Sequence, residues 1–269
     1  MPEFNAPLRD MRFVLHEVFD APALWARLPA LADSVDAATA EAILEEAAKV
    51  TSHLIAPLNR SGDEEGAQWQ DGQVSTPIGF KQAYATYIEG GWVGLSGNAD
   101  FGGMGMPKML AVQFEEMLYG ANSSFALYSA LSSGACLALD AHASEPLKSL
   151  YLPPMYEGRW AGSMCLTEAH AGTDLGLIRT RAEPMADGSF SITGSKIFIT
   201  GGDQDLTENI VHLVLAKLPD APAGPKGISL FVVPKVLVNA DGSLGNPNAV
   251  SCGSIEHKMG IKASATCVM

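Results

Sequence analysis

The sequence predicts an α+β protein in which helices occupy the first part of the chain and strands the rest. Apolar residues recur at helical spacing from residue 8 to about residue 152. After Arg159 the pattern changes to short β-rich runs separated by turns. Because the two patterns do not alternate, a parallel βαβ sheet is not expected. We therefore predict an all-α domain over residues 1–158 and a β-domain over residues 159–269.

The composition limits the classes of function. The 269 residues are 47% hydrophobic and 17% charged, which suits a large core and argues against wholesale disorder. The net charge of -13 argues against a nucleic-acid partner, since phosphate binding needs a basic patch. No apolar run approaches the roughly 20 residues that span a bilayer, and the N-terminus has no secretory signal pattern. We predict a cytoplasmic protein that binds neither nucleic acid nor membrane.

No metal site is expected from the cysteine and histidine pattern. The four cysteines are far apart and form no CxxC pair, and the six histidines form no HExxH or HxH cluster. We expect buried free thiols in a reducing compartment. The cysteines are Cys136, Cys165, Cys252 and Cys267.

Each helix is predicted from apolar spacing and from its end signals. Ser34 or Asp36 could cap the third helix, and Pro153-Pro154 should end the last one. An exposed polar loop is expected at 59–76 and a glycine-rich turn at 94–107. Helices are predicted at 8–19, in a short segment opened by Pro22, and at 37–58, 77–89, 107–119, 123–141 and 145–152.

The strands are predicted from short β-rich runs and from turns such as Asp187-Gly188 and Asp241-Gly242. The sequence stops inside the last run, which predicts a truncated or cleaved product; a short terminal edge strand is the alternative. The predicted strands are 160–166, 177–183, 189–193, 196–200, 210–217, 227–234, 250–257 and 265–269.

Two glycine patterns do not indicate known motifs. The run from Gly102 to Gly105 follows no apolar strand and has the wrong spacing for a dinucleotide fingerprint. The sequence Gly162-Ser163-Met164 lacks the second glycine of a nucleophile elbow.

The segment 164–174 is the strongest candidate for a ligand site. A strand ends at Leu166, and Thr167 then offers a hydroxyl and an N–H at the strand tip. The small residues of Ala171-Gly172-Thr173 let a ligand approach the backbone, and successive N–H groups can hold a phosphate. An ordinary Thr/Gly hairpin is the alternative reading of the same residues.

The same segment resembles the signature of the acyl-CoA dehydrogenases. Cys-Leu-Thr-Glu-x-x-Ala-Gly-Thr-Asp at 165–174 matches that signature, and Gly-x-Lys-x-Phe-Ile-Thr at 194–200 resembles the second flavin motif, where Trp is commoner than Phe. Segments 91–95, 101–105 and 114–116 resemble the turn and the helix that precede these two motifs in the family. Segments 6–13 and 254–260 resemble the large-subunit branch that includes 3-methylmercaptopropionyl-CoA dehydrogenases.

The resemblance implies a fold and a cofactor. The fold is an N-terminal all-α domain and a β-barrel-like middle domain, truncated at its C-terminal end, without the family's C-terminal four-helix domain. The cofactor is FAD. Thr167 is expected to hydrogen-bond the flavin ring, and Thr200 is expected to lie near flavin N5. Thr173 is expected to contact a phosphate of FAD or of the acyl-CoA substrate. Phe198 should lie against the isoalloxazine. The expected FAD contacts are Met164, Cys165, Leu166, Thr167, Gly172, Thr173, Phe198, Ile199 and Thr200.

Two positions depart from the family pattern. Ala169-His170 replaces the usual Pro-Gly, and Leu177 stands where the signature has a small residue. These departures put the shape of the loop in question.

The reaction implied by the resemblance is α,β-dehydrogenation of an acyl-CoA in fatty acid metabolism. A glutamate base removes the α-proton while the β-hydride passes to flavin N5. The family draws that base from the missing domain, so no catalytic residue is named here, and Glu168 is assigned a structural role. The expected partners are an acyl-CoA, an electron-transfer flavoprotein as electron acceptor, and further copies in a homodimer or tetramer.

Other functions remain open. The chain could be a catalytically incomplete flavin- or thioester-binding module. The fold is also shared by acyl-CoA oxidases, nitroalkane oxidases and two-component flavin monooxygenases, which differ from dehydrogenases in their use of O₂.

Overall fold

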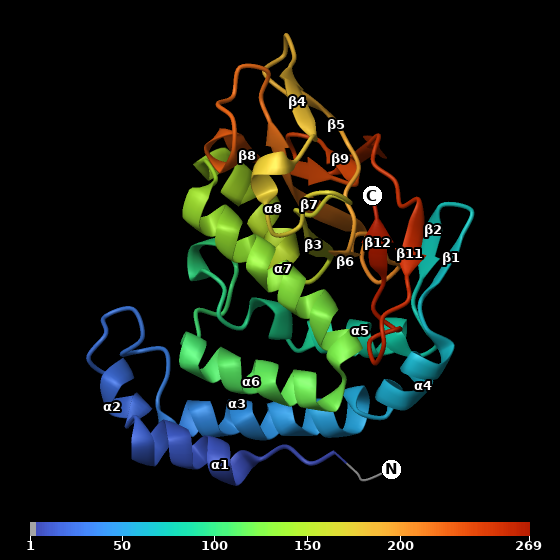
Figure 1. The fold of residues 1–269 in the computed structure, drawn as a ribbon. Helices are drawn as coiled ribbons and strands as arrows, with labels where there is room; N and C mark the ends of the chain where they lie inside the picture. The colour runs from blue at the N-terminus through green and yellow to red at the C-terminus, as the bar shows by residue number, and fades with distance from the viewer. Residues whose placement is uncertain (1–3) are drawn as a thin grey trace.

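The computed structural model describes residues 4–269 and confirms the segregation of helices and strands. In Figure 1, α1, α3 and α6 lie one above another, and α7 lies between them and the strands. Residues 1–3, on which the expected absence of a secretory signal partly rests, lie outside the described residues. The helices are α1 (Leu8–Arg12), α2 (Ala21–Trp25), α3 (Ala37–Lys49), α4 (Leu58–Glu65), α5 (Phe80–Glu89), α6 (Lys108–Ala121), α7 (Ser123–His142) and α8 (Glu145–Tyr156).

Local hydrogen bonds explain how α3 begins and how it changes. The Asp36 carboxylate accepts the Thr39 N–H at 2.7 Å, so Asp36 is the cap of this helix. The helix continues into the π-helical turn η2 (Val50–Ile55). There the Thr51 hydroxyl donates to the Ala47 carbonyl at 2.8 Å, and this bond competes with the regular backbone ladder.

Two predictions for the helical part are wrong. Residues 59–76 are not a loop but form most of α4 and a hairpin of β1 (Gln68–Gln70) and β2 (Gln73–Ser75). The Trp69 indole donates to the Cys252 carbonyl at 2.9 Å, so a distant contact holds this polar hairpin. Nor do the two prolines end α8, because the fully buried Leu152 and Met155 hold its last turns against the core.

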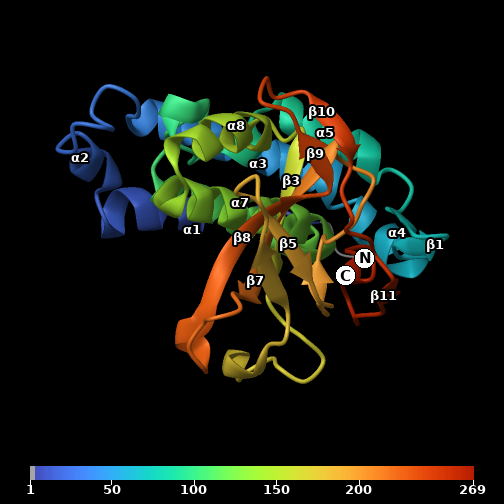
Figure 2. The same ribbon diagram turned by 90° about the horizontal axis from the view of Figure 1, so that it is seen from above.

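The main sheet is built on β7. Strand β3 pairs with it in parallel on one edge, β8 pairs antiparallel on the other, and β4 and β5 extend the first edge. Figure 2 shows β7 and β8 extending away from α7. In a second sheet, β12 lies between β11 and β6. The strands are β3 (Trp160–Cys165), β4 (Arg181–Pro184), β5 (Phe190–Thr193), β6 (Ile199–Thr200), β7 (Asn209–Lys217), β8 (Ile228–Pro234), β9 (Val236–Val238), β10 (Leu244–Pro247), β11 (Ser254–Glu256) and β12 (Thr266–Val268).

Some predicted strand limits are wrong. The run 177–183 pairs only from Arg181, after the short helix η5 (Leu175–Leu177). The run 196–200 is a strand only at its last two residues, because Phe198 has a positive φ of 59° that breaks the extended chain. The hairpin of β9 and β10 was not predicted as strands, although its Asp241-Gly242 turn was.

The two sheets pack around one buried cluster, which gives this part its barrel-like form. The cluster includes Cys165, Ile199, Val214 and Cys267 from both sheets. All four cysteines of the chain are buried and free, as predicted. Burial raises the pKa of the Cys165 thiol to about 11, so this side chain behaves as a small apolar group.

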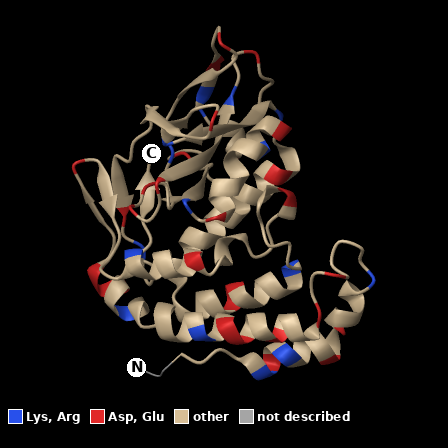
Figure 3. Ribbon diagram, turned by 180° about the vertical axis from the view of Figure 1, so that it is seen from behind, with Lys and Arg blue, Asp and Glu red and all other residues tan. Residues whose placement is uncertain are grey.

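Charge is spread over the surface. Figure 3 shows Asp and Glu on helices and loops, interspersed with fewer Lys and Arg. Within residues 4–269, no helix has the length and apolar character needed to cross a membrane. Nor does this part of the chain hold a group of His, Cys, Asp and Glu that could bind a metal ion.

One buried histidine lies at the centre of the main sheet. His212 of β7 is fully buried, and its Nδ1 lies 2.7 Å from the Ser163 hydroxyl on β3. Its Nε2 has no hydrogen-bond partner among the described residues. Burial, assisted by the positive charge of Lys235, lowers the pKa of His212 to about 4. The folded protein therefore keeps this imidazole neutral.

We expect the free energy of unfolding to fall as the pH drops from about 6.5 towards 4. In that range the unfolded chain protonates His212 while the folded chain does not, so the unfolded state binds more protons. The total loss should be about 3 kcal/mol. Urea denaturation across this range measures it. His212→Gln should remove most of the slope and His142→Gln, at an exposed site, should not; an unchanged slope in His212→Gln contradicts the assignment.

Candidate functional site

The candidate site forms where two separate segments meet beyond the end of β3. Strand β3 stops pairing at Cys165, and the next residues continue past the sheet. The Ile197 N–H donates to the Thr167 carbonyl at 2.8 Å. The N–H and carbonyl of Lys196 also pair with Met269, at 2.8 and 2.7 Å. The structure therefore brings the two sequence motifs, 164–174 and 194–200, side by side.

A tight turn follows Thr167. Glu168 and Ala171 exchange two backbone hydrogen bonds of 3.0 Å each, with Ala169 and His170 at the tip. The Nε2 of His170 lies 3.0 Å from the Leu177 carbonyl. The two departures from the family signature therefore touch each other. This contact links the tip of the turn to the segment that contains Leu177.

The Glu168 carboxylate holds this loop to the rest of the site. It is 4% exposed and accepts the Arg179 N–H at 2.7 Å, the Thr180 N–H at 3.0 Å and the Thr180 hydroxyl at 2.6 Å. It also pairs with the ammonium of Lys196 at 3.0 Å, which is buried to the same extent. Lys196 donates in addition to the Leu166 carbonyl at 3.1 Å.

The environment of Glu168 favours its ionised form. Burial alone raises the pKa of a carboxyl group, but the Thr180 hydroxyl, the two N–H groups and Lys196 outweigh it. Together they lower the pKa of Glu168 to about 2. A carboxylate with that pKa, whose lone pairs already accept hydrogen bonds, is a poor proton acceptor. The contacts of Glu168 therefore give it a structural role.

The threonines predicted for the site present unused hydroxyl groups. Thr167 and Thr200 are half-buried and Thr173 is exposed. Over residues 4–269 none of these three hydroxyls has a hydrogen-bond partner. They are available to a ligand that carries carbonyl, ring nitrogen or phosphate acceptors.

The remaining predicted residues divide into exposed and buried groups. Phe198 is 47% exposed, in a left-handed conformation that is an outlier for a bulky side chain. Gly172 is exposed beside Thr167. The side chains of Cys165 and Ile199 are buried in the core, so these residues can offer a ligand only their main chain. Met164 and Leu166 are half-buried.

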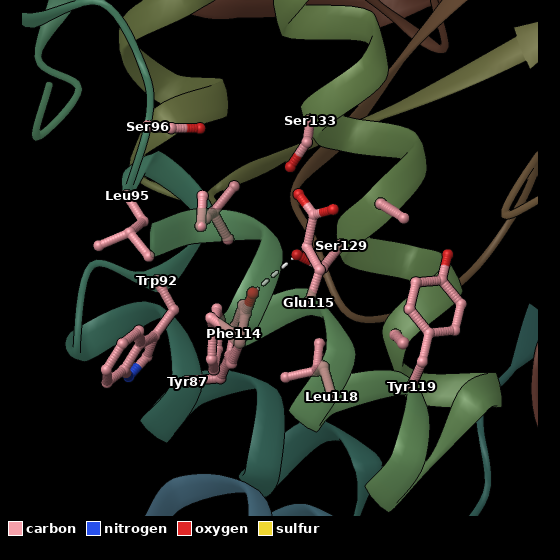
Figure 4. Close-up of a pocket in the computed structure, with 14 residues that line it drawn as sticks. Tyr87, Trp92, Leu95, Ser96, Phe114, Glu115, Leu118, Tyr119, Ser129 and Ser133 are labelled. Atoms are coloured by element: carbon pink, nitrogen blue, oxygen red, sulfur yellow. Dashed lines mark hydrogen bonds between the residues drawn. The ribbon is translucent and has the colours of Figure 1, made fainter. Parts of the chain in front are cut away.

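A second feature, not identified from the sequence, is a pocket between α6, α7 and the turn η3 (Trp92–Gly94). Tyr87, Trp92 and Phe114 form its aromatic side. The Tyr87 and Ser129 hydroxyls share a hydrogen bond of 2.7 Å, and Figure 4 shows Glu115 directed into the same space. The cavity volume is about 30 Å³. Polar serines at 129 and 133, spaced by one turn in an apolar helix, were the signal in the sequence.

Two family models together match most of the chain. The model of the acyl-CoA dehydrogenase N-terminal domain matches residues 37–159, and that of the acyl-CoA dehydrogenase middle domain matches residues 163–269.

Curated relatives and solved structures agree with these models. The chain is 44% identical over 99% of its length to a 3-methylmercaptopropionyl-CoA dehydrogenase of Ruegeria pomeroyi. It is 40% identical over 96% of its length to a butyryl-CoA dehydrogenase of Syntrophomonas wolfei. The chain spans only 45% and 43% of the lengths of these relatives. A Bacillus anthracis acyl-CoA dehydrogenase solved in complex with FAD has a TM-score of 0.68, covering 86% of this chain and 35% of that one; at 22% identity it shows the fold alone.

Replacement of Lys196 by Met should destabilise the protein by about 3–5 kcal/mol, because it leaves the buried Glu168 carboxylate without its cation. Urea denaturation measures the change. Glu168→Gln in the Lys196→Met background should restore part of the loss.

The matched control is Lys49→Met, which removes the same kind of pair with Glu46 at an exposed site. That change should cost at most about 1 kcal/mol. A Lys196→Met protein as stable as the Lys49→Met control would show that the buried pair does not hold the loop.

Proposed function

Because the chain belongs to the acyl-CoA dehydrogenase family, we propose that it forms the FAD-binding part of an enzyme that dehydrogenates an acyl-CoA thioester between its α- and β-carbons. The main support is the hydrogen bond between Ile197 and Thr167, because it places the two flavin-type motifs next to each other. The chain spans less than half of its curated relatives, so the activity of the whole protein is part of this proposal.

The residues at the site suit FAD chemically. The hydroxyls of Thr167 and Thr200 can donate to the acceptors of a flavin ring, and the exposed face of Phe198 can stack on it. The exposed Gly172 and Thr173 can meet a phosphate of FAD or of the acyl-CoA. Met164, Cys165, Leu166 and Ile199 would contribute main-chain contacts. When bound, FAD supplies the acceptor for the two electrons that leave the substrate.

Glu168, the buried carboxylate of this site, is not a suitable base for the α-proton. Glu168 is excluded by its pKa of about 2 and by its four hydrogen bonds. We therefore propose that residues 1–269 alone do not remove the α-proton, and that the base belongs to another part of the enzyme. An electron-transfer flavoprotein as acceptor, a homo-oligomer, a cytoplasmic location and a role in fatty acid metabolism belong to the same proposal.

The competing activities can be distinguished by how the flavin responds to acyl-CoA and by how fast the reduced flavin reacts with O₂. A visible spectrum is recorded under anaerobic conditions while acyl-CoA is added to an assembly that contains the base. A dehydrogenase should bleach its flavin band and recover it slowly in O₂, whereas an oxidase should recover it at once. A two-component monooxygenase should not bleach with any acyl-CoA but should turn over with added reduced flavin. A binding module should keep its band under all these conditions.

The pocket beside Tyr87 and Ser129 is our candidate for the end of the acyl chain. Helix α7 connects this pocket to the flavin-type motif at 194–200. The ring of Tyr128 lies beside Gly201, which follows Thr200, and Ser129, the next residue of α7, lines the pocket. A cavity of about 30 Å³ holds little more than a water molecule or a methyl group. This favours short acyl groups, which also occur in the names of the two relatives.

The cofactor assignment predicts that Thr167→Val binds FAD about two- to tenfold more weakly than the unchanged protein, because one hydrogen bond to the ring is lost. Quenching of flavin fluorescence during titration measures the dissociation constant. Thr193→Val, at an exposed position of β5, is the control and should not change it. Absence of FAD binding by the unchanged protein would refute the proposal.

The pocket assignment predicts that Leu118→Ala shifts acyl-CoA preference towards longer chains, because Leu118 lines the cavity. Dissociation constants for acyl-CoAs of increasing length should then reach their minimum at a longer chain. Leu110→Ala is the matched control, since it removes a buried leucine of the same helix that does not line the pocket. An identical length profile in the two variants would rule out this assignment.

A further inference from the structure

A lysine lies over the exposed aromatic ring of the flavin motif. The ammonium of Lys258 is 4.5 Å from the centre of the Phe198 ring. Lys258 is half-buried and pairs with no carboxylate within residues 4–269. Although the chain has a net charge of -13, this cation lies against an aromatic ring and not against a carboxylate.

The loop that carries Lys258 is fixed at several points. The Ile261 N–H donates to the Lys258 carbonyl at 3.2 Å. Lys262 accepts the Ala67 N–H at 2.8 Å and donates its own N–H to the Asp63 carboxylate at 3.0 Å. The Tyr128 hydroxyl donates to the Ala263 carbonyl at 3.0 Å. These contacts with α4, α7 and the segment before β1 fix the backbone of the loop from which Lys258 projects.

Phe198 is held in a conformation that costs energy. A φ of 59° is unfavourable for an aromatic side chain, and such outliers persist where the surroundings enforce them. The neighbours on both sides are anchored, since Ile197 bonds to Thr167 and Ile199 pairs with Cys267. The ring therefore projects from a fixed backbone, and the lysine lies over one of its faces.

We propose that Lys258 is a positioning residue for the flavin: it holds the Phe198 ring from one face and leaves the other face for the isoalloxazine. This inference rests on the proposed FAD site. The attraction between an ammonium and an aromatic face fixes the orientation of the ring before the cofactor binds. The positive charge beyond the ring also favours the more electron-rich, reduced form of the flavin over the oxidised form.

The test compares Lys258→Gln with Lys258→Arg. Loss of the charge in Lys258→Gln should raise the FAD dissociation constant about two- to fivefold and lower the midpoint potential of the bound flavin. Lys258→Arg keeps a cation that can lie on the ring and should restore both values. Titration of flavin fluorescence and potentiometric titration provide the two measurements, with thermal unfolding as the check on folding.

Two controls show whether Lys258 acts through Phe198. Lys262→Gln removes the same charge from an exposed position of the same loop and should change neither value. In a Phe198→Leu background, Lys258→Gln should not weaken FAD binding further, because the ring through which the lysine positions the flavin is gone.

Three results would overturn the inference. They are wild-type affinity and potential in Lys258→Gln, an equal shift in Lys262→Gln, and a full Lys258→Gln effect on FAD affinity in the Phe198→Leu background. If the unchanged protein binds no FAD, the proposed function itself fails, and this inference fails with it. That outcome is recognisable because it precedes any comparison of variants.

Discussion

The ion pair of Glu168 and Lys196 is the interaction on which the site depends. Each of the two flavin-type motifs contributes one of its members, and both side chains are 4% exposed. Two charges at this depth are tolerated only because hydrogen bonds satisfy them: Glu168 accepts from Thr180 and Arg179, and Lys196 donates to Leu166. The pair therefore sets the distance between the motifs, and with it the positions of the threonine hydroxyls.

The sequence could single out the candidate site because the residues assigned to it lie in two short segments. Signature and spacing located 164–174 and 194–200, and the order of helices and strands followed from apolar period alone. Neither the motif signatures nor the apolar period could show that Glu168 and Lys196 form an ion pair, since 28 residues separate them. The left-handed Phe198 was equally hidden, because an apolar run predicts an extended strand and only the paired neighbours enforce the exception.

The two wrong predictions for the helical part share a physical cause. The polar segment 59–76 and the pair Pro153-Pro154 both carry strong local signals, and in each case distant packing prevails over them. Trp69 holds the hairpin by a bond to Cys252, and the burial of Leu152 and Met155 keeps α8 helical through the prolines. Local propensities amount to at most a few kcal/mol, which buried contacts elsewhere in the chain can outweigh.

Helix α7 contacts β3, the loop of Lys258 and the pocket beside Tyr87, so the helical half takes a direct part in shaping the candidate site. Ser132 accepts the Gly162 N–H of β3 at 3.0 Å, and no side chain fits at Gly162, since a Cβ there would lie 2.5 Å from Ala135. Tyr128 holds the loop of Lys258 through the Ala263 carbonyl, and Ser129 lines the pocket. The packing of one helix against β3 thus helps to fix the candidate site, the loop of Lys258 and the pocket relative to one another. A ligand that reaches all three must adopt the spacing that α7 imposes.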